Sequence, residues 1–246
     1  GASGIAIGNI IGSNMTQITL ILGAAALFRS LDTTKKALYR DGLMMLVAST
    51  LALIVLLDYR LTNVEGMVLA TIYLVYLFML FKTEKWAGER QSAENLHIKI
   101  GALILGIAGV IVGADLLVKH SIAVADYFKV PSSIIGLTLV AVGTSLPELS
   151  ISLMAAVKGL PGLSIGNLIG SNITDPLFSM GIAASVNPMG LAVDPWIVRF
   201  DAPVMIGACI LALFLMRTDW NLSRREGVLL MGIYLLYLYV NFIIKI

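Results

Sequence analysis

Long apolar stretches, separated by short segments that carry charges or turn residues, dominate the chain. Eight of them can form membrane-crossing helices, at about 5–28, 41–57, 64–81, 98–119, 132–157, 163–186, 198–216 and 225–244. A hydrocarbon layer of about 30 Å needs about 20 helical residues for each crossing. No segment alternates polar and apolar positions as a membrane β-barrel does, and backbone groups in lipid must be satisfied internally. The pattern predicts an all-α polytopic membrane protein.

The composition supports a protein that lies in a lipid bilayer. Of the 246 residues, 58% are apolar and 13% are charged, whereas a soluble domain has about 25% charged residues. The net charge of +2 and the scatter of the 17 basic residues give no basic face, so no nucleic-acid partner is expected. The one cysteine, Cys209, excludes a disulfide framework within the chain.

The basic residues also predict the direction of the helices, because short cytoplasmic loops carry the excess of Lys and Arg. If the loop after the first helix is cytoplasmic, twelve basic residues face the cytoplasm and five face the other side. The two sets are Arg29, Lys35, Lys36, Arg40, Lys82, Lys85, Arg90, Lys99, Lys158, Arg217, Arg224 and Arg225, against Arg60, Lys119, Lys129, Arg199 and Lys245. This assignment places the hydrophilic loop 82–97 in the cytoplasm, as a solvated linker, and the protein in the cell (plasma) membrane.

The chain contains two copies of one unit. The sequence IGNIIGSN at Ile7–Asn14 returns as IGNLIGSN at Ile165–Asn172, 158 positions later. The pair Glu65-Gly66 returns as Glu226-Gly227, 161 positions later. The two Gly-Ser-Asn helices are the first and the sixth crossing. Because successive crossings alternate in direction, the copies must run in opposite directions. Inverted repeats of this kind are typical of secondary transporters, which bind their substrate near the middle of the membrane.

The repeats define the expected domains. The first repeat covers 1–81, the linker covers 82–97, and the second, five-helix repeat covers 98–246. Two predicted helices precede the Gly-Ser-Asn helix of the second copy, and none precedes that of the first. By symmetry, we expect two further helices upstream of Gly1, roughly 60 residues in all. The chain would then hold eight transmembrane helices of an expected ten.

Two acidic residues lie near the middle of predicted helices. Glu148 follows Pro147 in the fifth helix, and Asp175 precedes Pro176 in the sixth. A charge in hydrocarbon costs several kcal/mol, so an intramembrane acid indicates function. Proline removes a helical hydrogen bond, so both helices are predicted to unwind there and to expose carbonyl groups beside the acids. No basic residue lies near the centre of either helix.

The groups around these acids indicate a site for a hard cation. Ca²⁺ accepts about 6–8 oxygen ligands in flexible geometry, whereas Mg²⁺ requires a strict octahedron. Sulfur and imidazole are absent from the region, which disfavours zinc and copper. The candidate ligands are Glu148, Asp175, the hydroxyls of Thr144, Ser145, Ser171 and Ser13, and the amide of Gln17, which occupies the position that matches Asp175. Carboxylates also bind H⁺ and Na⁺, so these ions are expected to compete with Ca²⁺.

Several other repeated residues have a structural interpretation. The spacing of Gly8, Gly12, Gly166 and Gly170 favours close helix packing. For Asn9, Asn14, Asn167 and Asn172, hydrogen bonds between helices and a direct role in the site stay equally open. Glu65 and Glu226 are expected to stabilise the first turns of their helices.

Three motifs resemble the cation/calcium exchanger superfamily, most closely the prokaryotic Na⁺/Ca²⁺ exchangers: GTSLPE at 143–148, GNLIGSNITD at 166–175 and GNIIGSN at 8–14. The resemblance implies ten helices in two inverted five-helix repeats, of which this chain would hold the third to the tenth. It also implies a gate formed by the first and sixth of the family's ten helices. The family's sixth helix corresponds to 98–119 of this chain. The implied cation ligands are the carbonyls of Ala141 and Thr144, the Ser145 hydroxyl, Glu148, Ser171, Asp175 and Ser13. Gln17 departs from the asparagine that is common at its position.

Together, these features predict a secondary antiporter that exchanges Ca²⁺ for Na⁺ by alternating access. The chain is expected to have no enzymatic activity and no organic cofactor, and a single chain is the expected transport unit. A Ca²⁺/H⁺ exchanger is the alternative, although the resemblance favours Na⁺ because H⁺ exchangers of the superfamily usually have an amide at the position of Asp175. A passive channel stays open as a third possibility. An intramembrane protease is disfavoured, because its motifs are absent.

Overall fold

The computed structural model describes residues 2–83 and 140–245, together with scattered positions between 100 and 127. The first copy contains α1 (Ala2–Met15), η1 (Thr16–Ile21), α2 (Leu22–Phe28), η2 (Ala37–Gly42), α3 (Leu43–Val55) and α4 (Asn63–Thr83). The second contains α7 (Ala141–Thr144), α8 (Leu146–Val157), α9 (Pro161–Thr174), η4 (Asp175–Ser179), α10 (Met180–Ser185), η5 (Ile197–Asp201), α11 (Ala202–Thr218) and α12 (Arg224–Lys245). The segments named η are π-helical turns that continue directly into the neighbouring α-helices.

The described helices confirm the all-α prediction. Five of them are long and apolar enough to cross a membrane: Ala6–Phe28, Ala37–Val55, Asn63–Thr83, Ile197–Thr218 and Arg224–Ile243. The predicted helix at 163–186 corresponds to the run from α9 to α10. The predicted helix at 98–119, the linker 82–97 and the first part of 132–157 lie wholly or mostly outside the described residues.

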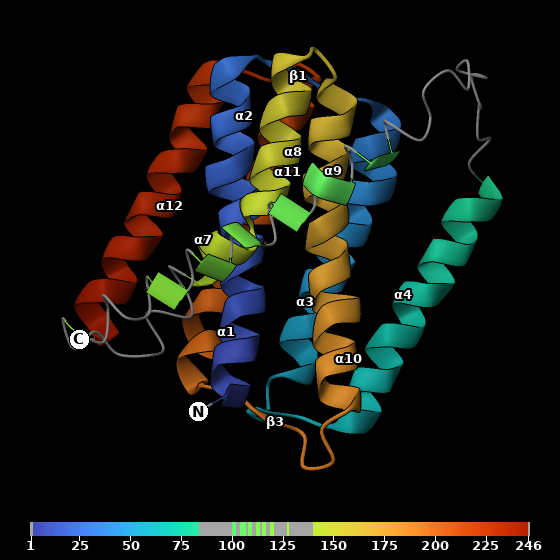
Figure 1. Ribbon diagram of the computed structural model, residues 1–246, viewed down its shortest axis with the longest axis vertical. Helices are drawn as coiled ribbons and strands as arrows, with labels where there is room; N and C mark the ends of the chain where they lie inside the picture. The colour runs from blue at the N-terminus through green and yellow to red at the C-terminus, as the bar shows by residue number, and fades with distance from the viewer. Residues whose placement is uncertain are drawn as a thin grey trace.

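The two copies run in opposite directions, as Figure 1 shows for α1–α2 and α9–α10. Two short antiparallel pairs of strands join them. The strand β1 (Leu31–Asp32) pairs with β4 (Asn221–Leu222), and β2 (Arg60–Leu61) pairs with β3 (Leu191–Ala192) at the other end of the bundle. Each pair takes one strand from each copy. The inverted repeat predicted from the sequence is therefore confirmed.

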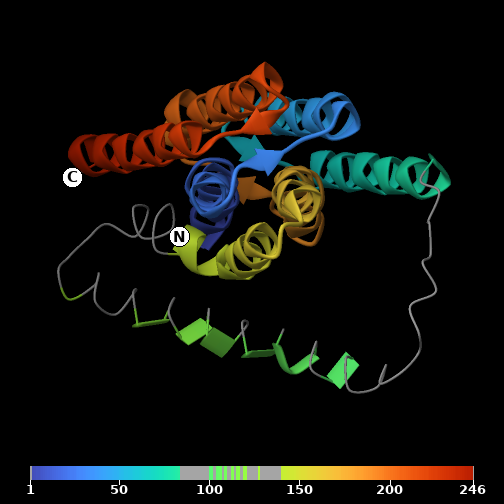
Figure 2. The same ribbon diagram turned by 90° about the horizontal axis from the view of Figure 1, so that it is seen from above.

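Burial separates central helices from peripheral ones. In the hydrophobic stretch of Ala6–Phe28, 83% of the residues are buried, whereas only 17% are buried in that of α4. Seen from above, α1–α2 and α9 lie in the middle, with α8 on one side and α3, α11 and α12 on the other (Figure 2). The apolar side chains of α1 and α9 belong to one core. The two Gly-Ser-Asn helices thus form the centre of the molecule.

Glycine pairs allow helices of the two copies to cross closely. A Cβ atom added to Gly227 on α12 would lie 2.7 Å from the carbonyl oxygen of Gly23 on α2. On the opposite side, a Cβ added to Gly66 on α4 would lie 2.6 Å from the carbonyl oxygen of Gly181 on α10. Both distances are shorter than van der Waals contact, so only glycine fits without a shift of backbone. These crossings explain why the glycines occur in both copies.

The helices α4 and α12 begin with equivalent caps. Glu226 Oε2 accepts hydrogen bonds from the backbone N–H and the hydroxyl of Ser223, both at 2.7 Å. Glu65 Oε2 makes the same two bonds with Thr62, at 2.8 and 2.7 Å. In return, the hydroxyls of Ser223 and Thr62 accept the backbone N–H groups of Glu226 and Glu65, at 3.4 and 3.3 Å, and this reciprocal pairing is a capping box. The capping interpretation of both glutamates is confirmed.

Replacing Glu226 with alanine is expected to lower the free energy of unfolding by about 0.5–2 kcal/mol, as the loss of a cap does in other helices. The cause is a backbone N–H at Ser223 that loses its acceptor. The midpoint of thermal unfolding of the purified protein measures the effect. Glu226→Gln, which keeps an acceptor oxygen, is the control and should unfold close to the wild-type temperature; equal losses in both variants would contradict the capping role.

The two prolines affect their helices differently. Near Pro147 the helix is interrupted as predicted, because Ser145, with φ −91° and ψ 4°, separates α7 from α8. At Pro176 the prediction of an unwound segment is wrong, since the chain stays helical and widens into the π-helical turn η4. The equivalent segment of the first copy, η1, is also π-helical although it contains no proline. The wider turn is therefore a property of the repeat and accommodates Pro176 without a break.

Candidate cation site

Three helical segments meet in the middle of the bundle: the junction of α1 and η1, the break between α7 and α8, and the junction of α9 and η4 (Figure 1). All eight candidate ligands lie on these segments. The helix break at Ser145 and the starts of the π-helical turns η1 and η4 lie on these segments. The fold thus places residues from both copies around one central region.

Hydroxyl and carbonyl groups of the two copies are in contact at α1 and α7. Ser13 Oγ lies 3.1 Å from Thr144 Oγ1 and donates to the carbonyl oxygen of Ala141 at 3.4 Å. Thr144 Oγ1 in turn donates to Asn9 Oδ1 at 3.0 Å. Ser13 and Ala141 are buried, whereas Thr144 is exposed at the edge of this cluster. Three of the candidate ligands therefore form one group of oxygen atoms.

The helix break places a serine and a glutamate beside this group. Ser145 is fully buried, and among the described residues neither its hydroxyl nor Glu148 Oε2 has a hydrogen-bond partner. Asn167 Nδ2 donates to Ser152 Oγ at 2.9 Å and to the backbone carbonyl of Glu148 at 3.3 Å, which joins α9 to α8. Buried polar atoms normally have partners, and those without one often mark a site for an ion or a ligand.

Asp175 lies at the start of η4 and receives hydrogen bonds on both carboxylate oxygens. Gln17 Nε2 donates to Oδ2 at 3.4 Å, and Ser179 Oγ donates to Oδ1 at 3.3 Å. Glu148 lies on α8, which packs against α9, the helix that continues into η4 and Asp175. Ser171 is one helical turn before Asp175, and its carbonyl accepts the Asp175 backbone N–H. The two acids thus lie on neighbouring helices.

Comparison with known proteins identifies the family. Residues 1–82 and 98–243 match the sequence model of the family described as sodium/calcium exchanger protein. The chain belongs to the sodium/calcium exchanger family. Its sequence is 33% identical to that of the sodium/calcium exchanger MaX1 of Methanosarcina acetivorans, over 99% of this chain and 81% of that protein. It is also 33% identical to inner membrane protein YrbG of Escherichia coli, over 95% of this chain and 76% of YrbG.

A solved structure of the sodium-calcium exchanger NCX_Mj has the same fold. It matches 96% of this chain, which covers 76% of NCX_Mj, with a TM-score of 0.78 and 31% sequence identity. Together with the apolar helices, the family shows that this exchanger is a multi-pass membrane protein that exchanges cations and is not an enzyme. The resemblance stated from the sequence motifs is thereby confirmed.

Close helix packing, which the sequence predicts for the two glycines on α9 of this exchanger, is not observed among the described residues. A Cβ added to Gly166 or Gly170 would meet no described atom within 4 Å. Both glycines instead line a cavity of about 270 Å³ together with residues of η2 and α4, among them Asp41 and Tyr76. Within the described part of the chain, these two glycines therefore leave space instead of bringing two helices together.

Hydrogen bonds between helices account for three of the four repeated asparagines. Asn9 accepts from Thr144, Asn167 donates to Ser152, and Asn172 Nδ2 donates to Gln17 Oε1 at 2.8 Å. The last bond was not anticipated, and it turns the oxygen of Gln17 away from Asp175. The amide of Gln17 thus faces the site with its nitrogen in this structure, whereas the sequence predicts an oxygen ligand.

The sequence analysis missed a second pair of acids, Asp41 and Asp201. Asp201 is fully buried at the end of η5, where Asn241 Nδ2 donates to its Oδ1 at 3.1 Å. Asp41 of η2 accepts from the Tyr76 hydroxyl at 3.2 Å and pairs with the neighbouring Arg40 at 2.6 Å. Their equal position in the two copies, 160 residues apart, is the signal that could have identified them.

Proposed function

We propose that the protein exchanges Ca²⁺ for Na⁺ across the cell membrane by alternating access, and that both ions bind in turn at Glu148 and Asp175. The observation that carries this proposal is that the two acids lie on neighbouring helices of the second copy, in contact with the central helix of the first, and that Glu148 Oε2 has no hydrogen-bond partner among the described residues. Two carboxylates balance the charge of one divalent cation. A bare pair of negative charges at membrane depth is costly, and a bound cation removes that cost.

The proposed ligand set contains only oxygen atoms. It consists of the carboxylates of Glu148 and Asp175, the carbonyls of Ala141 and Thr144, and the hydroxyls of Thr144, Ser145, Ser171 and Ser13. The unpartnered oxygens of Ser145 and Glu148 support this assignment, because buried acceptors of this kind suit a hard cation. Within the described residues, no three His, Cys, Asp or Glu side chains come together. Neutral oxygens would then supply most of the coordination.

Na⁺ is proposed as the ion that is exchanged for Ca²⁺, for two reasons. The relatives MaX1 and NCX_Mj are named as sodium/calcium exchangers. In addition, position 175 carries a carboxylate, where an amide would be typical of the Ca²⁺/H⁺ exchangers of the superfamily. A carboxylate offers an anionic ligand to a monovalent ion as well as to Ca²⁺. A transport experiment must therefore distinguish Ca²⁺/Na⁺ exchange from the alternative, Ca²⁺/H⁺ exchange.

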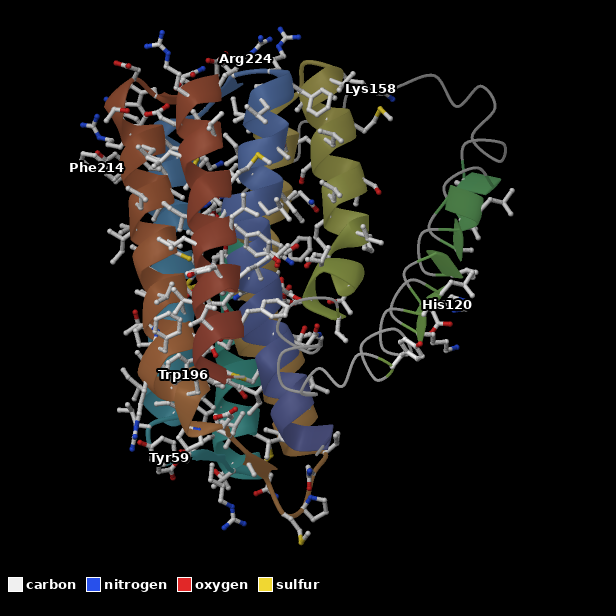
Figure 3. All side chains as sticks on the ribbon, turned by 90° about the vertical axis from the view of Figure 1, so that its left-hand side faces the viewer. Tyr59, His120, Lys158, Trp196, Phe214 and Arg224 are labelled. Carbon is white, nitrogen blue, oxygen red and sulfur yellow. The ribbon has the colours of Figure 1, made fainter. Side chains whose placement is uncertain are left out.

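The orientation in the membrane follows from the distribution of charge. Arg224 and Lys158 lie at one end of the bundle, and Tyr59 and Trp196 lie toward the other (Figure 3). Because cytoplasmic ends carry the excess of basic residues, we assign the end with Arg224 to the cytoplasm. The inverted copies would then exchange conformations to open the site to each side in turn.

Uptake of ⁴⁵Ca²⁺ into proteoliposomes tests the proposal. With Na⁺ inside and none outside, we expect rapid accumulation of Ca²⁺ that stops when the Na⁺ gradient is collapsed. A pH gradient of matched size, without Na⁺, is expected to drive no accumulation above that of empty liposomes. Uptake driven by the pH gradient alone would establish the Ca²⁺/H⁺ alternative, and ion currents far above carrier turnover would indicate a channel.

A further inference from the structure

A hydrogen-bond network fixes the orientation of the Gln17 amide. Asn172 Nδ2 donates to the carbonyl oxygen of Leu168 at 2.9 Å and to Gln17 Oε1 at 2.8 Å. A backbone carbonyl only accepts hydrogen bonds, so the contact with Leu168 identifies the nitrogen of the Asn172 amide. The same nitrogen faces Gln17, whose oxygen must therefore point to Asn172.

The nitrogen of Gln17 consequently faces Asp175, where Nε2 donates to Oδ2 at 3.4 Å. Gln17 is 2% exposed and Asn172 is fully buried, so bulk water offers neither amide another partner. Gln17 also occupies the position in the first copy that Asp175 occupies in the second, 158 residues later. At the point where the sequence predicts one more oxygen ligand, the structure places a hydrogen-bond donor.

We propose that Gln17 is an internal competitor of the cation and not its ligand. Its amide N–H group, which carries a partial positive charge, stabilises the Asp175 carboxylate, so a cation must compete with this hydrogen bond for the negative charge of the same carboxylate. Asn172 is the positioning residue that holds the amide in this orientation. The inference rests on the proposed function, because it takes Asp175 to be a cation ligand.

A group that competes with the cation weakens cation binding, and an exchanger needs this weakening in order to release its ions. Without a cation, a buried carboxylate is costly unless a donor satisfies it, and Gln17 lowers that cost. A more stable empty site means weaker cation binding and faster release, which alternating access requires. An oxygen ligand would have the opposite effect on affinity. The two roles of Gln17 therefore predict opposite changes in the dissociation constant for Ca²⁺ when Gln17 is replaced.

Equilibrium binding of ⁴⁵Ca²⁺ to the purified protein measures the direction of this change. Gln17→Met keeps the length of the side chain and removes both the donor and the oxygen. Since hydrogen bonds to charged groups are among the strong ones, we expect the dissociation constant for Ca²⁺ to fall roughly ten-fold. An unchanged or higher dissociation constant overturns the proposal. If Gln17→Met does not fold, Gln17→Leu carries the same expectation.

The role of Asn172 is tested by a double-mutant cycle. Asn172→Leu frees the Gln17 amide to rotate, so Ca²⁺ should bind more tightly in the wild-type background. Combined with Gln17→Met, Asn172→Leu should have no further effect, because no amide is left to position. Independent, additive effects of the two substitutions would refute the positioning role, since coupling is expected only for residues that act through one another.

Thr19→Val is the matched control. Thr19 is fully buried on the same π-helical segment as Gln17, and its hydroxyl donates to the carbonyl of Met15 within the helix. Its removal should leave the dissociation constant unchanged, and a comparable tightening would show that the effect belongs to the segment and overturn the proposal. If the wild type binds no Ca²⁺, the proposed function itself fails. If the wild type binds Ca²⁺ and Glu148→Gln does not, failure of Gln17→Met to tighten binding refutes only the role of Gln17.

Discussion

Glu148→Gln is expected to abolish exchange of Ca²⁺ for Na⁺, and Asp175→Asn is expected to do the same. Each substitution keeps the size of the side chain and removes one of two negative charges proposed to balance the cation. Loss of one partner of a desolvated charge pair costs about 3–5 kcal/mol, which corresponds to a roughly 150- to 5,000-fold weaker affinity. Na⁺-driven ⁴⁵Ca²⁺ uptake into proteoliposomes measures the effect.

Glu65→Gln is the control for these two variants. Glu65 is also an acid on a membrane helix, but it caps the start of α4, and glutamine retains the acceptor oxygen for Thr62. Uptake by this variant should stay near the wild-type rate at an equal amount of reconstituted protein. Near-normal uptake by Glu148→Gln or Asp175→Asn, in proteoliposomes where the control is also active, would refute the proposed site.

Gly227→Val is expected to give a large loss of stability. The first added carbon would already lie 2.7 Å from the carbonyl oxygen of Gly23, a backbone atom that cannot rotate away. Overpacking of this kind costs about 1–3 kcal/mol and separates the helices that clash. The midpoint of thermal unfolding in detergent should fall accordingly.

Gly232→Val is the matched control, because Gly232 lies on the same helix and a Cβ added there meets no described atom within 4 Å. Its midpoint should stay close to that of the wild type. Gly66→Val tests the symmetric crossing of α4 with α10 and should be destabilised like Gly227→Val. Equal midpoints for Gly227→Val and Gly232→Val would show that close approach at Gly23 does not stabilise the fold.

Much of the fold could be predicted because its signals are local in the sequence. Long apolar runs determine which segments become helices, since the length of a crossing is fixed by the thickness of the hydrocarbon layer. The repeated Gly-Ser-Asn motif, together with an odd number of predicted crossings, predicted that the copies are inverted. The missing N–H of proline correctly predicted the break near Pro147, although the same argument was wrong at Pro176.

The candidate site could be predicted only as a set of residues. Glu148 and Asp175 attract attention because acids are rare in apolar segments, whatever surrounds them. The orientation of the Gln17 amide depends on Asn172, 155 positions away, and no feature of either segment alone indicates it. The same holds for Asp201, whose burial depends on helices that pack around it.

The sequence by itself thus determined the helical class and the inverted repeat, and it identified the two acids of the candidate site and the oxygen-bearing residues near them in the chain. Only the tertiary structure decided that Pro176 lies in a π-helical turn, that Gly23 crosses Gly227, and that the nitrogen of Gln17 faces Asp175. The physical reason is the range of the forces involved. Hydrophobicity and proline act within one segment, whereas hydrogen bonds and close packing require atoms that the chain brings together from opposite copies.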